Sequence, residues 1–132
     1  MNYLLDTHSF LWFLFSPHRL SRTAAEIILH QENTIYVSSI TFWEISLKYS
    51  LNKIQLERVT PEQLPNFAQE AGMELLDFRA DEAASFCQLP KTAHNDPFDR
   101  MLIWLAMRHH LTIISKDRHF KDYVSQGLKI TW

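Results

Sequence analysis

Short apolar runs alternate along the whole chain with longer segments in which apolar residues recur at helical spacing. Runs with the length and composition of buried strands occupy residues 3–5, 34–39, 73–78, 111–115 and 128–132. Helical patterns occupy residues 9–15, 20–31, 40–51, 80–89 and 97–110, with a short helix from about Pro61 to Gly72 and a short helix or turn over 116–127. Ser21 and Asp81 are expected to cap the helices that follow them. This alternation predicts an α/β fold with a central, mostly parallel, five-stranded sheet flanked by helices.

Composition narrows the classes of function. The 132 residues suit one domain spanning 1–132, and 46% apolar content is enough for a core. Two glycines are too few for a glycine-rich phosphate loop. A net charge of −2 disfavours passive coating of nucleic acid, although bound cations would supply positive charge locally.

The N-terminal stretch and the single cysteine bear on compartment. Residues 1–18 are apolar but lack a basic region and are interrupted by Asp6 and His8, so we expect a core strand and helix rather than a signal peptide or membrane span. Cys87 is alone, which excludes an internal disulfide and a thiolate cluster, and we expect it in the core. These features favour a cytoplasmic protein without a membrane partner.

Two acidic residues stand at the carboxyl ends of predicted strands, where open α/β sheets bind ligands. Asp6 directly follows the first strand, and Asp117 comes shortly after the run "LTIIS". Each has a structural alternative, because Asp is also a favoured helix N-cap or turn residue.

Two further acids lie on predicted helices. Glu44 shares a stripe with Ile40, Leu47 and Leu51, so a carboxylate interrupts an apolar face and needs a cation, a donor or a metal beside it. The alternative is an i,i+4 salt bridge to Lys48.

In "HNDPFDR", Asp96 is expected to cap a helix whose first residue is Pro97. Asp99 then lies one turn in, beside the apolar stripe, and either serves the same cap or faces a site. A parallel sheet would bring all these acids to one edge, where their mutual repulsion requires a divalent cation. Oxygen ligands without thiolates suit Mg²⁺ or Mn²⁺, and such sites commonly hydrolyse phosphodiesters.

Four motifs in order, "YLLDTHSFLW", "VSSITFWEISLKYSLNKI", "HNDPFDRMLIWLAM" and "TIISKDRHF", resemble those of the PIN-domain ribonucleases, most closely the VapC-type toxins of toxin–antitoxin pairs. The resemblance covers essentially the whole chain. It implies a Mg²⁺- or Mn²⁺-dependent endoribonuclease with Asp6, Glu44, Asp99 and Asp117 as catalytic metal ligands. Similar proteins frequently have a second acid at the position of Asp96, and the resemblance adds this residue to the metal site. Thr7 and Ser115 match positions where a hydroxyl is usual, and they would orient a carboxylate or a metal-bound water.

The resemblance also implies an RNA substrate, a homodimer or larger assembly, and a cognate VapB-like antitoxin whose C-terminal segment covers the active-site groove. Arg100, Lys116 and Arg118 are weaker candidates for RNA contact, with a solvated turn as the alternative. His94 and His119 are weaker still. Among the aromatic residues, Phe10 is expected in the core, and Trp12, Phe13 and Trp43 are candidates for an interface.

Two rival interpretations are weighed against this one. A phosphoacceptor receiver-type domain needs a pair of acids after the first strand, where this chain has Asp6 alone, and Asp77 lacks the expected partners. A non-catalytic PIN-like module that binds RNA or protein predicts the loss of one or more of the acids, and none is lost.

Overall fold

The computed structural model describes residues 1–132 and contains one five-stranded sheet. The strands are β1 (Asn2–Leu5), β2 (Thr34–Ser38), β3 (Glu74–Leu76), β4 (Thr112–Ile114) and β5 (Lys129–Thr131), in the order β3-β2-β1-β4-β5. Every neighbouring pair is parallel. The predicted fold class is therefore confirmed, and the strand order places β1 at the centre.

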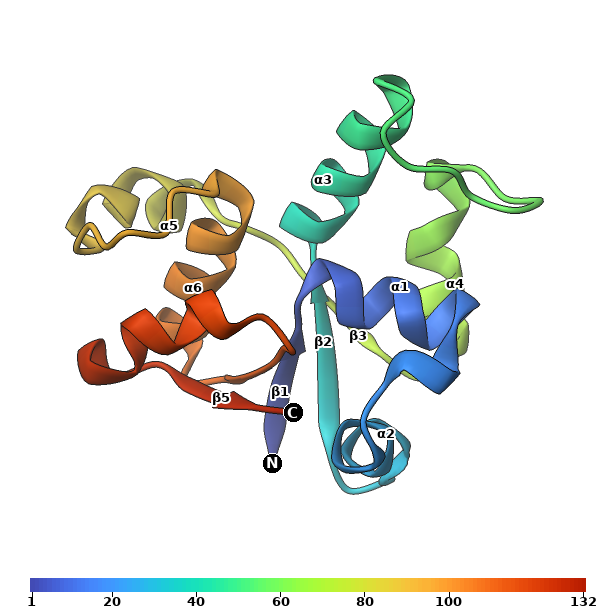
Figure 1. Ribbon diagram of the computed structural model, residues 1–132, viewed down its shortest axis with the longest axis horizontal. Helices are drawn as coiled ribbons and strands as arrows, with labels where there is room; N and C mark the ends of the chain where they lie inside the picture. The colour runs from blue at the N-terminus through green and yellow to red at the C-terminus, as the bar shows by residue number, and fades with distance from the viewer.

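Alternating side chains of the central strands divide the core into two layers, because successive residues of a strand point to opposite faces. Tyr3 and Leu5 belong to one apolar cluster, and Leu4 belongs to the other. The first cluster receives side chains from α1 (Thr7–Phe15), α2 (Arg22–Leu29) and α4 (Leu64–Glu70). The second is filled largely by α6 (Pro97–His109) and the 3₁₀ segment Arg118–Gln126. Figure 1 shows α1 and α4 on one side of β1 and β2, and α6 on the other.

The strand order reverses at β1. After β1 the chain builds β2 and β3 on one side, and it then crosses over to build β4 and β5 on the other. The segments after β1 and β4 therefore lie next to each other and diverge onto opposite faces. Such a reversal leaves a crevice at the carboxyl ends of the strands, where doubly wound sheets bind ligands.

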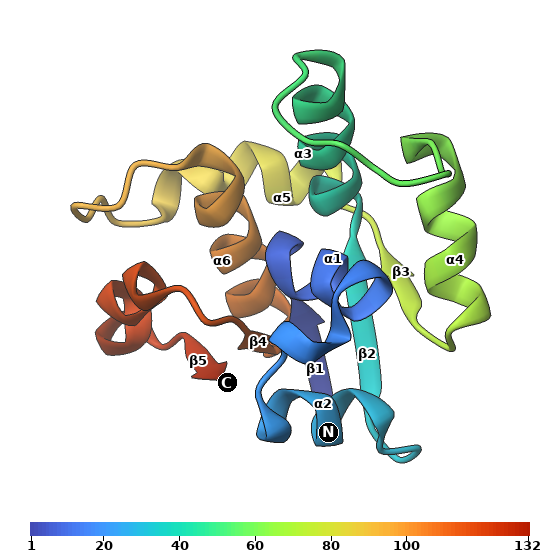
Figure 2. The same ribbon diagram turned by 45° about the vertical axis from the view of Figure 1, so that its right-hand side comes forward.

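The helix α3 (Ser39–Ser50) differs from its predicted apolar stripe. Ile40 and Ile45 are fully buried and Glu44 is 3% exposed, but Leu47 and Leu51 are 39% and 54% exposed. The reason is that α3 extends away from the sheet (Figure 2), so only its N-terminal part has a core to pack against.

Two smaller predictions are wrong. The helix α5 (Ala80–Ser85) begins one residue before Asp81, and Arg79 is its N-cap residue. The reason is that the buried carboxylate of Glu82 accepts a hydrogen bond from the backbone N–H of Arg79 at 3.0 Å, which fixes the start of the helix. Cys87 is exposed, because it lies in the 3₁₀ turn Phe86–Gln88 after α5.

None of the helices combines the length and apolar character that a membrane crossing requires.

Candidate metal centre

Asp6 directly follows β1 and is the N-cap of α1. Its Oδ1 accepts a hydrogen bond from the backbone N–H of Ser9 at 2.8 Å, and its Oδ2 accepts one from the Ser115 hydroxyl at 2.6 Å. The side chain is almost wholly buried. Burial raises the pKa of Asp6, and the hydrogen bonds from Ser115 and Ser9 only partly oppose that rise. The helix N-cap that was weighed as the structural alternative for Asp6 is therefore present, and it holds the carboxylate at the crevice.

Ser115 joins two of the predicted acids. It directly follows β4, and while its hydroxyl donates to Asp6 it also accepts a hydrogen bond from the backbone N–H of Asp117 at 3.0 Å. Asp117 caps the 3₁₀ segment Arg118–Gln126 through a 2.9 Å bond from the N–H of His119. Burial alone would raise the pKa of Asp117, but hydrogen bonds from His119 and the charges of His119 and His94 outweigh it and lower the pKa.

Glu44 enters the crevice from α3. Its Oε1 accepts a 2.6 Å hydrogen bond from the Thr7 hydroxyl, and its Oε2 pairs with Lys48, one helical turn further on. Burial would lower the pKa of Lys48, but the hydrogen bond and the charge of Glu44, together with Asp96 and Asp99, raise it. The salt bridge to Lys48, which sequence reasoning weighed against a functional role, is present. The charge of the Glu44 carboxylate also contributes to the raised pKa of Asp99, although Glu44 is not in the tightest group of ligand atoms.

Asp99 lies in the first turn of α6. Asp96 accepts a hydrogen bond from the backbone N–H of Asp99 at 2.9 Å, which confirms the predicted cap. The Asp99 carboxylate itself faces inward, with its Oδ2 2.9 Å from Nε2 of His94. Burial and the charges of four other acids together raise the pKa of Asp99 to about 8; the four acids are Asp96, Glu44, Asp6 and Asp117.

The raised pKa of Asp99 has two kinds of cause. The largest single cause is burial, which disfavours the charged form, and crowding by the negative charges of the four neighbouring acids adds to it. The same crowding fits a divalent cation, because an ion of charge +2 would reverse the repulsion. The donor set of carboxylate oxygens is the one that Mg²⁺ and Mn²⁺ accept.

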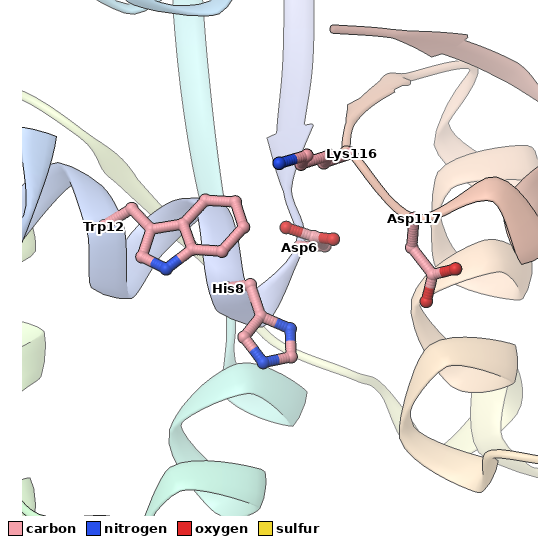
Figure 3. Close-up of a pocket in the computed structure, with 5 residues that line it drawn as sticks. All are labelled: Asp6, His8, Trp12, Lys116 and Asp117. Atoms are coloured by element: carbon pink, nitrogen blue, oxygen red, sulfur yellow. The ribbon is translucent and has the colours of Figure 1, made fainter. Parts of the chain in front are cut away.

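A cavity of about 240 Å³ opens beside the acids. Figure 3 shows Asp6 between Lys116 and His8, with Trp12 on the α1 side and Asp117 on the other. The indole of Trp12 is tilted against the His8 ring at 5.7 Å and meets the edge of Trp132 at 5.8 Å. The cavity is therefore lined by two carboxylates, two aromatic rings and one lysine.

The predicted basic residues separate into two groups. Lys116 and Arg118 are exposed and line a second cavity that shares Asp117 with the first. Arg100 is half-buried, because its guanidinium donates to the Tyr123 hydroxyl at 3.1 Å and lies 5.0 Å from the ring centre of Phe86. Arg100 therefore packs α6 against its neighbours.

The aromatic residues of α1 are mostly accounted for by packing. Phe10 is fully buried, as predicted, and Phe13 packs on the same core cluster. Trp12 is half-buried and lines the cavity beside Asp6. Trp43 of α3 is 56% exposed and touches only the edge of Phe98 among the aromatic rings.

Sequence reasoning left two residues of the site without a role. Lys48 was considered only as the salt-bridge partner of Glu44, although its i,i+4 spacing from Glu44 already predicted that it lies beside the site. His94, considered only for RNA phosphate, instead contacts Asp99. Its position five residues before Asp99 gave no periodic signal, because it lies in the irregular loop that precedes α6.

Comparisons with known proteins agree with this arrangement. The family model of the PIN domain matches residues 3–125. The ribonuclease VapC22 of Mycobacterium tuberculosis is 28% identical over 120 residues, which are 91% of this chain and 90% of that protein.

Solved structures show the same fold at low identity. In the VapBC2 structure from Rickettsia felis, bound to a DNA fragment from its promoter, one chain matches with a TM-score of 0.72 and 21% identity, over 99% of this chain and 98% of that one. In the DNA-bound VapBC structure from Salmonella typhimurium, a chain matches with a TM-score of 0.65 and 19% identity, over 99% and 97%. Because the family model spans nearly the whole sheet and every acid of the crevice, this chain belongs to the PIN domain family.

Proposed function

We propose that this chain is a metal-dependent endoribonuclease that acts as the toxin of a toxin–antitoxin pair and is held inactive by a cognate VapB-like antitoxin. Two likenesses support the proposal: the curated relative is a ribonuclease, and the similar structures include VapBC complexes. The observation that carries it is the position of Asp99, whose burial and proximity to four further acids together raise its pKa to about 8.

In this proposal Asp6, Glu44, Asp99 and Asp117 hold Mg²⁺ or Mn²⁺. When bound, the cation supplies activation of a water nucleophile and neutralisation of charge on the scissile phosphate. Thr7 and Ser115 fix the carboxylates of Glu44 and Asp6 through short hydrogen bonds.

Lys48 and Asp96 complete the proposed site. Lys48 offsets the negative charge of Glu44, so this carboxylate keeps a positive partner when the cation is absent. Asp96 caps α6 and thereby aims Asp99, and its charge adds to the attraction for the cation. One of its oxygens is committed to the cap, so we assign it the supporting role.

For the RNA substrate, Lys116 and Arg118 are the proposed phosphate contacts. Both are exposed, both line the second cavity, and they flank Asp117 in the sequence. A basic side chain there would attract the RNA backbone to an otherwise acidic site. Arg100 is left out of this role, because it is occupied with Tyr123 and the Leu89 carbonyl.

Two apolar surfaces are proposed for protein partners. A groove of about 320 Å³ between α1 and residues 54–57 is lined by Leu11, Trp12 and Phe15 and shares Trp12 with the cavity beside Asp6. An antitoxin segment in this groove would end at the catalytic acids. The exposed Trp43, Leu47 and Leu51 of α3 form a second surface, which suits a homodimer.

The test is RNA cleavage by the purified protein with and without Mg²⁺ or Mn²⁺. We expect cleavage that EDTA stops and that Asp6→Asn and Asp99→Asn each reduce at least ~100-fold, because each removes a charge that holds the cation. The matched control is Asp122→Asn, since Asp122 is an exposed acid outside the crevice. Expression of the wild type alone should arrest growth, and co-expression of a small antitoxin encoded beside it should restore growth.

The opposite outcome would favour the binding-module alternative. If the wild type leaves every RNA intact with either metal and does not slow growth, the nuclease proposal fails. Binding of RNA or of a protein partner under those conditions would then identify a non-catalytic PIN-like module.

A further inference from the structure

A histidine lies inside the carboxylate cluster. The side chain of His94 is only 10% exposed, and its Nε2 lies 2.9 Å from Oδ2 of Asp99. Potential ligand atoms of His94, Asp99 and Asp117 all lie within 4.8 Å of one another, and no other group of three or more His, Cys, Asp or Glu side chains in the structure does so. The tightest candidate ligand group in the molecule therefore contains one nitrogen and two oxygens.

The ring of His94 is held in this orientation by its surroundings. It stacks on the ring of His119, with centroids 5.0 Å apart and planes 7° apart, and it meets the buried Phe120 edge-on at 6.2 Å. The Thr92 hydroxyl accepts a hydrogen bond from the backbone N–H of His94 at 3.2 Å, which fixes the loop beneath the ring. A preorganised ring loses little freedom when it binds an ion.

The spacing matches that of metal ligands. Bonds of about 2.1 Å place adjacent ligands of an octahedral ion ~3 Å apart and opposite ligands ~4.2 Å apart. The 2.9 Å between His94 and Asp99 corresponds to an adjacent pair. All three ligand atoms lie within 4.8 Å of one another, so at most a small contraction is needed to enclose one ion.

We propose that His94 is a nitrogen ligand of the divalent cation and that it makes the site prefer Mn²⁺ to Mg²⁺. The inference rests on the proposed function, because it concerns the same cation. Mn²⁺ is the weakest binder of the first-row transition ions and accepts carboxylate oxygen, but as a transition-metal ion it takes an imidazole nitrogen more readily than Mg²⁺, which favours oxygen ligands and dehydrates reluctantly. The carboxylates by themselves accept either ion, and the added nitrogen ligand favours Mn²⁺ over Mg²⁺.

His119 is the matched comparison. It stacks on His94 and also contacts a carboxylate, with its Nδ1 2.9 Å from Oδ1 of Asp117. Its side chain is 67% exposed, and it is not a member of the three-residue group. The two histidines therefore lie side by side, and each contacts one carboxylate, His94 that of Asp99 and His119 that of Asp117. They differ in the proposed role.

The experiment is pulsed electron paramagnetic resonance of Mn²⁺ bound to the full chain. A nitrogen ligand gives a ¹⁴N modulation, which should change to the ¹⁵N pattern when the protein is made with ¹⁵N-histidine. We expect His94→Gln to lose the modulation and His119→Gln to keep it. In Mn²⁺ titrations, His94→Gln should weaken binding about 10–100-fold, with a much smaller change for Mg²⁺. Circular dichroism of each variant checks that it is folded.

The outcomes separate this inference from the proposed function. Absence of nitrogen modulation in wild type that binds Mn²⁺ and cleaves RNA overturns the role of His94 and leaves the nuclease intact. The labelled wild type gives that result even if His94→Gln does not fold. Loss of the modulation in His119→Gln but not in His94→Gln also overturns it. Failure of the wild type to bind Mn²⁺ and to cleave RNA overturns both proposals.

Discussion

Replacing Asp99 with asparagine should stabilise the ion-free protein while it removes cation binding. The pKa of Asp99 is raised from 3.8 to about 8 by burial and by the neighbouring acids. A raised pKa means that the folded state binds the proton more tightly than the unfolded state does. The resulting stability is fully present below about pH 4 and is lost as the pH rises toward 8. Asparagine keeps the uncharged form at every pH.

The size of the effect follows from the pKa. At about 1.4 kcal/mol per pH unit, the difference between 3.8 and about 8 corresponds to a ceiling of roughly 5–6 kcal/mol. Asp99 is 20% exposed, so water and small movements relieve part of this cost. We expect Asp99→Asn to raise the free energy of unfolding in EDTA at pH 8 by ~2–4 kcal/mol. At pH 4.5 the two proteins should differ by less than ~1 kcal/mol.

The assay is urea unfolding of both proteins in EDTA across this pH range, repeated with Mn²⁺ or Mg²⁺. Wild type should lose stability with rising pH in EDTA and regain it when the cation is added, because a ligand of the folded state stabilises it. Asp99→Asn should show a flatter pH profile and little gain from either ion. Asp122→Asn, at an exposed position, should follow the wild type.

Parallel pH profiles for wild type and Asp99→Asn in EDTA would refute the reasoning, because they would show that Asp99 ionises freely in the folded protein. A loss of stability in Asp99→Asn at pH 8 without metal would refute it as well. In either case Asp99 would not carry the electrostatic cost that burial and the neighbouring acids impose, and the electrostatic argument for a cation would fail.

Three other substitutions test the surroundings of the site. Ser115→Ala removes the donor to buried Asp6 and should weaken Mn²⁺ binding by about 10–100-fold in calorimetric titrations; unchanged affinity would contradict the positioning role. Lys48→Met leaves the buried Glu44 carboxylate unpaired and should cost ~1–2 kcal/mol in urea unfolding, a value reduced because Lys48 is 37% exposed; an unchanged midpoint would show that the pair contributes nothing. Leu51→Glu, at a 54% exposed position, should change stability by less than ~0.5 kcal/mol yet disrupt a dimer in sedimentation experiments; an intact dimer would exclude α3 as its interface.

Much of the fold is encoded in local patterns. The alternation within "YLL" sends Leu4 to one core layer and its two neighbours to the other, as a doubly covered central strand requires. Asp96 caps the helix that follows it, as predicted, and Asp6 and Asp117 occupy the cap positions that were weighed as structural alternatives. Such features depend on residues within one turn of each other, which is why they can be recognised in the sequence.

The errors and omissions concern contacts between elements. Leu47 and Leu51 carry a helical apolar pattern, but the sheet does not extend beneath that part of α3. Glu82 resembles a surface acid, yet it is buried with His109 of α6 as its partner. In each case burial depends on which distant segment packs there, and hydropathy along the chain carries no such information.

The sequence by itself determined the strands, the helix caps and the identities of the acids. Only the tertiary structure decided which of them meet, because strand order is set by crossovers and by the packing of helices on two faces. Ser115 reaches Asp6 across 109 residues because β4 pairs with β1. The same packing of α3 and α6 over that edge brings Glu44 and Asp99 close enough to raise the pKa of Asp99, and it places His94 among the carboxylates.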